Sequence, residues 1–280
     1  MKVSAPRIVD SISDVSFLCD AFRARRRLII DLSSVCWISP LGVVAALSTA
    51  LWAEERAIIV TVVLPESRAA RTYLASIGFY DELDRRGWEP DGDLDVDVEQ
   101  RVEACLPVTS LSASWEVDQA SEILVESLGE SAVATNIIQY IETVAVELTE
   151  NGREHGARCY VVAQSHTGHT SGTAGIHVAI ADSGPGFAET LRSFGPLSDA
   201  EAILKGFEEG ISGTAQPSRG FGLSHVQEAV DVYPGAELWL WSGKGVVLRA
   251  GGSFVPATTS RYAGTLATAY FPATPYTPTT

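Results

Sequence analysis

The stretch spanning residues 144–156, which reads VAVELTENGREHG, places polar residues at the spacing of a helix. In a helix, Glu147, Asn151 and Glu154 fall at i, i+4 and i+7 and therefore lie along one stripe. Gly156 stands where a left-handed C-terminal cap is expected, which predicts that the helix ends there. The polar stripe is either solvated surface or the wall of a site. A neighbouring apolar stripe, typical of a core-facing side, contains Ile137, Ile138, Ile141, Val144 and Leu148.

Three glycine-containing elements further along the chain favour the second interpretation. In chain order they hold Asp182, Gly184 and Gly186 in a D-x-G-x-G spacing, Gly220 and Gly222 at the start of a predicted helix, and Gly264 with Thr265 at the start of the last apolar strand. Four such elements in this order are much more specific than any one of them.

Together the four elements resemble the GHKL or Bergerat-fold ATPases, which include gyrase, histidine kinases and anti-sigma-factor serine kinases. The resemblance covers about residues 105–273. It is nearest to the anti-sigma kinase branch, because the family pattern E-x-x-x-N-x-x-x-H-G appears as Glu147, Asn151, His155 and Gly156. The resemblance implies an α/β sandwich in which helices cover one face of a mixed sheet.

The resemblance also implies roles in binding ATP and Mg²⁺. Glu147 would be the general base that activates the attacking water or hydroxyl, and Asn151 would hold Mg²⁺. Asp182 would accept a hydrogen bond from the adenine amino group, with Thr265 nearby. The remaining nucleotide-binding positions implied are Glu154, His155, Gly184 and Gly186 beside the base, the candidate phosphate contact Arg219, and Gly220, Gly222 and Leu223 at a phosphate-cradling helix start.

Elementary chemistry is consistent with these roles. Phosphoryl transfer needs mainly positioning and charge neutralisation from the protein. Mg²⁺ takes few protein ligands and leans on nucleotide oxygens. Glycines before a helix leave N–H groups free to bind an anion. The chain has no Walker-type G-x-x-x-x-G-K-[ST] motif, so a P-loop site has no support. Two departures from the family are Gly152, where alanine is usual, and the bulky Phe221 in the second glycine box.

The first part of the chain predicts a small α/β layer. Strands are expected at 27–32 and 57–64, and helices at 40–53 and 65–77. Residues 31–42 resemble the STAS domain of anti-anti-sigma factors, in which a serine after a strand is phosphorylated.

The position of that serine is occupied here by Leu41, which has no nucleophile. Ser39 is a weak alternative acceptor, since such a serine more often caps the following helix. The STAS-like part is therefore interpreted as a degenerate interaction module.

The expected organisation is a STAS-like domain at 1–85, an acidic linker at 86–104, the ATPase-like domain at 105–273 and a frayed tail at 274–280. An EF-hand interpretation of the linker fails, because the positions that need Gly and Glu are Val96 and Val102. Within the ATPase-like domain a helix is expected at 117–128, strands at 159–165, 176–181, 238–241 and 265–271, and a mobile lid at 185–216 with a helix at 201–209.

Charge narrows the range of partners. The net charge is −15 and the pI is near 4.7, which argues against direct nucleic-acid binding and against an anionic membrane surface. The four cysteines are scattered, and the apolar run at residues 41–53 is too short to span a bilayer. We expect a cytoplasmic protein that binds a protein partner, either sigma-factor-like or a STAS-type regulator; a homodimer is compatible with the sequence.

Three functions remain open. A sensor histidine kinase needs a phospho-accepting His upstream, and none precedes His155. The first hypothesis is an ATP-dependent regulator that binds or phosphorylates a partner's hydroxyl, as anti-sigma serine/threonine kinases do. The second is a non-catalytic switch driven by ATP, and the third is a simple ATPase.

Overall fold

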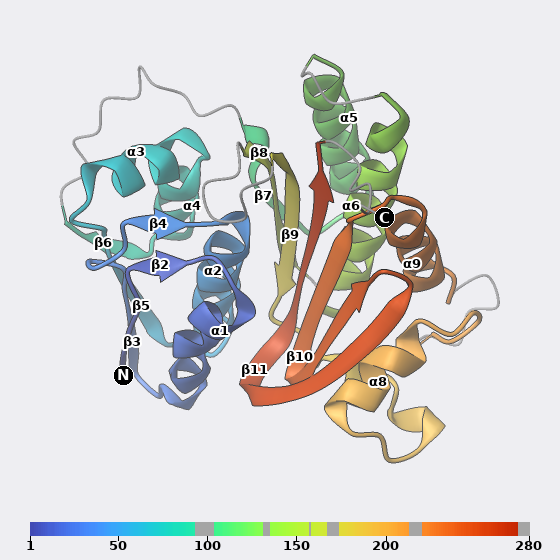
Figure 1. Cartoon of the computed structure of the whole chain (residues 1–280). Coiled ribbons are helices and arrows are strands. Elements are labelled where there is room, and N and C mark those ends of the chain that lie inside the picture. The colour runs from blue at the N-terminus through green and yellow to red at the C-terminus, as the bar shows by residue number, and fades with distance from the viewer. Residues whose placement is uncertain (93–103, 131–134, 157, 167–173, 213–219, 274–280) are drawn as a thin grey trace.

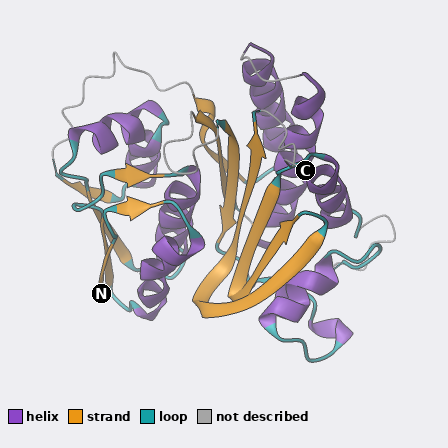
Figure 2. Ribbon diagram, in the orientation of Figure 1, coloured by secondary structure: helices purple, strands orange, loops and turns teal. Residues whose placement is uncertain are grey.

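The computed structural model describes residues 1–92, 104–130, 135–156, 158–166, 174–212 and 220–273. The chain is a mixed α/β protein that contains both parallel and antiparallel sheets (Figure 1, Figure 2). Within these ranges, no helix combines the length and the apolar character that crossing a membrane requires.

The N-terminal part forms a four-stranded parallel sheet and a two-stranded parallel sheet with flanking helices. The strand order of the larger sheet is β1 (Lys2–Ser4), β3 (Arg27–Asp31), β5 (Ile59–Val63) and β6 (Glu89–Asp91), while β2 (Ile8–Val9) pairs with β4 (Trp37–Ile38). The helices are α1 (Ile12–Val15), η1 (Ser16–Arg23), α2 (Pro40–Glu54), α3 (Arg68–Ser76) and α4 (Phe79–Arg86). The predicted strand–helix alternation between residues 27 and 77 matches β3, α2, β5 and α3.

Strand β6 lies inside the segment expected to be the acidic linker. It pairs in parallel with β5, with Asp91 opposite Val63. The first sheet therefore extends beyond the boundary expected at residue 85. The larger share of the acidic segment, residues 93–103, lies outside the described residues.

The C-terminal part is a five-stranded sheet with the order β10-β11-β9-β8-β7. Its pairings among the described residues are all antiparallel, so the expected mixed sheet is not formed here. The strands are β7 (Ala104–Leu111), β8 (Cys159–His166), β9 (Gly175–Asp182), β10 (Glu237–Ala250) and β11 (Ser253–Pro272). The helices are α5 (Ser114–Glu130), α6 (Thr135–Gly156), α7 (Phe187–Thr190), η2 (Arg192–Phe194), α8 (Asp199–Gly206) and α9 (Gly222–Val232).

Helices cover both faces of this sheet, not one as expected. Successive side chains of a strand point to opposite faces, and β8 shows the result. Tyr160 and Val162 belong to a core shared with α2, whereas Val161 and Ala163 belong to a core shared with α5, α6 and α9. The second face is therefore closed by the N-terminal part of the chain.

Helix α2 is the element that joins the two parts. Every residue from Pro40 to Ala53 is buried, as expected for a helix that is apolar all round. It lies between the two larger sheets (Figure 1) and packs on β3 and β5 on one side and on β8, β9 and β11 on the other. One continuous core thus runs from the first sheet to the second.

Candidate functional site

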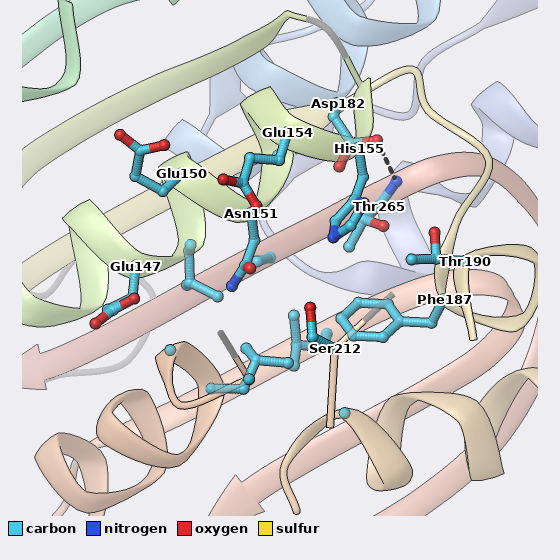
Figure 3. A pocket seen from close by; sticks show the side chains of 18 of the residues that line it. Glu147, Glu150, Asn151, Glu154, His155, Asp182, Phe187, Thr190, Ser212 and Thr265 are labelled. Atoms are coloured by element: carbon cyan, nitrogen blue, oxygen red, sulfur yellow. Dashed lines mark hydrogen bonds between the residues drawn. The ribbon is translucent and has the colours of Figure 1, made fainter. Parts of the chain in front are cut away.

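A cavity of about 520 Å³ lies between α6 and α9 and gathers most of the predicted site residues (Figure 3). Gly184 does not line it, and Arg219 lies outside the described residues. The predicted residues that do line it are Glu147, Asn151, Glu154, His155, Asp182, Gly186, Gly220, Gly222, Leu223 and Thr265. Elements far apart in the sequence therefore converge on one space.

Helix α6 supplies one wall through its polar stripe. Its apolar stripe is directed into the core, where Ile137, Ile141 and Val144 are each at most 1% exposed. Across the helix, Asn151 lines the cavity, and its Nδ2 atom is buried with no hydrogen-bond partner among the described residues. A buried amide nitrogen without a partner is uncommon in folded proteins, and this one can donate to a water or to a ligand oxygen in the cavity.

Asp182 lies at the end of β9, in the cavity wall, and is 4% exposed. Its Oδ1 atom accepts hydrogen bonds from the backbone N–H groups of Gly184 at 2.8 Å and Thr265 at 3.2 Å. Burial raises the pKa of this carboxyl from 3.8 to about 7, the two N–H groups oppose the rise, and the Glu55 carboxylate adds to it. Thr265 is thus the neighbour of Asp182, as the resemblance implies.

The glycines around Asp182 permit close packing of α6, the loop after β9 and β10. A Cβ atom on Gly156 would lie 2.6 Å from the Asp182 Cβ, and one on Gly184 would lie 2.6 Å from the His155 carbonyl oxygen. Gly186 has φ +79°, and a Cβ there would meet the Ser242 hydroxyl. Gly184 therefore allows the loop after β9 to contact α6 closely and does not form part of the cavity wall.

Gly156 ends α6 as predicted, but not in the predicted way. It is absent from the glycines with positive φ, so it is not a left-handed cap. Its lack of a side chain is required instead by the Asp182 contact. Gly152 has a similar explanation, because an added Cβ would stand 3.0 Å from the Cys159 Cβ on β8.

The start of α9 forms the wall opposite α6. Phe221 occupies the N-cap and makes no side-chain cap hydrogen bond, so backbone N–H groups of the first turn are left for another partner. Gly220 has φ +101°, a conformation that favours glycine. Phe221 is 42% exposed while also lining the cavity, so its bulk is accommodated partly outside.

Glu147 and His225 line the cavity and contact one another between α6 and α9. The Nδ1 atom of His225, on α9, lies 3.1 Å from the Glu147 Oε1 atom. The other carboxylate oxygen would be 2.6 Å from a Cβ placed on Gly222. Glu147 is thus held against the start of α9. His225 belongs to none of the sequence motifs, so the sequence did not indicate that it lines the site.

At the other end of the α6 stripe the charges are paired. Arg153 lies 2.5 Å from Glu150 and 3.7 Å from Glu154. Burial lowers the pKa of the His155 imidazole, which favours its neutral form. Lining residues that the sequence motifs missed include Ser114, Glu150, Phe187, Thr190, Ser212 and His225.

The donor set suits a metal ion that relies on few protein ligands. No group of three or more His, Cys, Asp or Glu side chains suited to a metal occurs in the described part of the chain. The cavity instead offers the Asn151 amide one helical turn from Glu147. Mg²⁺ bound beside a phosphate commonly has one or two protein ligands and several waters, so the residues present fit that ion.

Comparison of the sequence with protein-family models found no match, and comparison with curated proteins found none. The function is therefore inferred from the residues that line the cavity and from their geometry.

Proposed function

We propose that the chain is an ATP- and Mg²⁺-binding regulatory protein of the GHKL type, resembling anti-sigma serine/threonine kinases and carrying a degenerate STAS-like N-terminal part. The observation that carries the proposal is the convergence of four separate elements on one cavity, with Asp182 buried in its wall. A cavity of about 520 Å³ is within the usual range for small-molecule sites.

Each wall suits one part of the nucleotide. The Asp182 carboxylate, positioned by the N–H groups of Gly184 and Thr265, would accept the amino group of adenine. The open first turn of α9 would bind phosphate through its N–H groups and the helix dipole. Asn151 would hold Mg²⁺, which when bound neutralises phosphate charge. Glu147 would take the proton of the attacking hydroxyl or water.

A hydroxyl acceptor, if there is one, would belong to another protein. Leu41 offers no nucleophile at the STAS-like position, and Ser39 is only 2% exposed. Ser39 also lies on the α2 side of the five-stranded sheet, away from the cavity beside α6. This arrangement supports transfer to a separate partner over transfer within the chain.

A second candidate, the ATP-driven switch, is favoured by a contact between the two parts. The Ser183 hydroxyl lies 2.9 and 3.0 Å from the two carboxylate oxygens of Glu55, at the end of α2. Ser183 directly follows Asp182, so a nucleotide that moves this loop would act on α2. In this version ATP changes the N-terminal surface without chemistry.

Incubation with Mg²⁺ and ATP labelled on the γ-phosphate tests the proposal. We expect retained nucleotide in the wild type and in Glu147→Ala, and loss of retention in Asp182→Asn. Released phosphate or labelled protein should fall about 10²- to 10⁴-fold in Glu147→Ala, while the exposed control Glu126→Ala matches the wild type. Retention of ATP by the wild-type chain without released phosphate or labelled protein would favour the switch. Failure of the wild-type chain to retain ATP would refute the proposal.

A further inference from the structure

A second cavity, of about 480 Å³, lies on the opposite face of the five-stranded sheet. Its walls come from the β4–α2 junction and the start of α1 on one side, and from β8, β9, β10 and β11 on the other. It shares no lining residue with the cavity beside α6. The space is therefore separate from the proposed nucleotide site.

The sheet changes character where this cavity lies. Over most of the α2 face the strands present apolar rows, such as Tyr160, Ala181, Leu266 and Trp241, which pack in the shared core. Two residues further along each strand, the side chains on this face are still mainly apolar. At the next row it becomes polar, with Gln164, His177, Tyr270 and Glu237 side by side across four strands.

The row is exposed at Glu237 and buried at Gln164, where polar groups need hydrogen bonds because burying them without partners is unfavourable. Gln164 is 6% exposed, and its Oε1 atom accepts a hydrogen bond from the Tyr73 hydroxyl at 2.8 Å. Ser39 also lines the cavity. It is 2% exposed, and its Oγ atom has no partner among the described residues, although it occupies the N-cap position of α2. The expected cap bond is therefore absent, and this buried hydroxyl is left for another group.

The remaining lining residues indicate the charge of that group. The carboxylates Asp10 and Glu237 border the cavity, and no Lys or Arg is among its described lining residues. No ion pair between described residues includes either carboxylate, and the Glu237 Oε2 atom accepts a hydrogen bond from the Trp239 Nε1 atom at 3.4 Å. Much of the remaining cavity wall is formed by the aromatic rings of Trp37, Trp239 and Tyr270. Carboxylates beside aromatic faces attract a cation that carries an apolar body.

We infer that this cavity binds a small organic cation, an ammonium or guanidinium group on a hydrocarbon or aromatic body. The charged end lies toward Asp10 and Glu237, and the body lies against the aromatic rings. The volume suits one small molecule. Because the cavity lies between the N-terminal part and the sheet, such a ligand contacts both at once.

A charge series on one molecular body tests this inference with the full chain. The probes are 4-phenylbutylammonium, 4-phenylbutanol and 4-phenylbutanoate, measured by titration calorimetry. We expect the ammonium to bind about tenfold or more tightly than the alcohol, and the carboxylate to bind more weakly still. Equal affinity for the ammonium and the alcohol would overturn the inference.

Variants locate the binding. Asp10→Asn combined with Glu237→Gln should weaken ammonium binding about tenfold and leave alcohol binding unchanged, whereas the exposed control Glu122→Gln changes neither. Trp239→Leu should reduce the tryptophan emission change on binding, with Trp37 still beside the ligand, while Trp115→Leu, at a position that is 65% exposed, should leave it unchanged. Ammonium binding that persists in Asp182→Asn separates this site from the nucleotide cavity. Unaltered binding in the double variant, or loss of binding in Asp182→Asn, would refute the assignment.

Discussion

At the scale of single residues, Asp182 combines a proposed binding role with an unfavourable position for a charge. Its pKa is raised to about 7 in the folded chain against 3.8 ordinarily. Between these two values the folded state holds a proton that the unfolded state has released. The contribution of Asp182 to stability is therefore highest below about pH 4, falls as the pH rises to about 7, and is constant above that. The fall amounts to about 4 kcal/mol.

Asp182→Asn removes this dependence, because the amide carries no charge and its oxygen can still accept the N–H groups of Gly184 and Thr265. At pH 8 we expect the variant to be more stable than the wild type by up to about 4 kcal/mol, and at pH 5 by much less. Urea unfolding at the two pH values measures the difference. An identical difference at both values would show that burial does not perturb this carboxyl.

At the scale of secondary-structure elements, the contact between α6 and the start of α9 defines the proposed catalytic end of the cavity. A Cβ on Gly222 would lie 2.6 Å from the Glu147 Oε2 atom, the far end of a side chain that can move. Gly222→Ala should therefore fold normally, displace the Glu147 carboxylate from His225, and lower turnover about tenfold or more. Phosphate release and thermal unfolding separate these effects.

Gly129→Ala on α5 is the matched control, because nothing lies within 4 Å of its added Cβ. Alanine is favoured over glycine in helices by up to about 1 kcal/mol, so this control should be slightly stabilised and fully active. Unchanged turnover in Gly222→Ala would mean that the Glu147 position is not critical, and the role of general base would then be in doubt.

Sequence periodicity was sufficient for the strongly patterned elements and failed for others. The apolar stripes predicted α2, α5 and α6 closely, since a buried helix face leaves a regular signal. Strand β7 was missed, because Pro107 interrupts it and an acidic segment precedes it. The extension of β10 and β11 was missed because Gly243, Gly251 and Gly252 are typical of loops.

The site was predictable only where a motif fixed the spacing. Glu147, Asn151 and Asp182 belong to such patterns and line one cavity. His225 depends on how α9 packs against α6, which no local spacing encodes. The packing of α2 on the second face of the five-stranded sheet could not be predicted from the sequence either. A helix that is apolar all round shows the same pattern whichever sheet it covers.

At the scale of the whole molecule, the shared core makes the two parts interdependent. A protein limited to residues 104–280 would expose the sheet face that holds Tyr160, Val162, Trp241 and Leu266, all buried in the full chain. We expect this fragment to aggregate or to bind a hydrophobic dye, and the full chain to unfold in one transition. Size-exclusion chromatography and dye binding test the first expectation, and coincident near- and far-ultraviolet dichroism tests the second. A monomeric, cooperatively folding fragment would contradict the first expectation, and separate near- and far-ultraviolet transitions of the full chain would contradict the second.

Helix α2 also limits which substitutions and recombinations such a chain can accept during evolution. Its side chains touch one sheet on each side, so a replacement that suits one sheet must be tolerated by the other. A recombination event that joined the first 92 residues to a foreign sheet would set α2 against a surface it does not fit. The two parts are therefore expected to be inherited as one unit, and chimaeras built at this junction should need compensating changes on α2 before they become soluble.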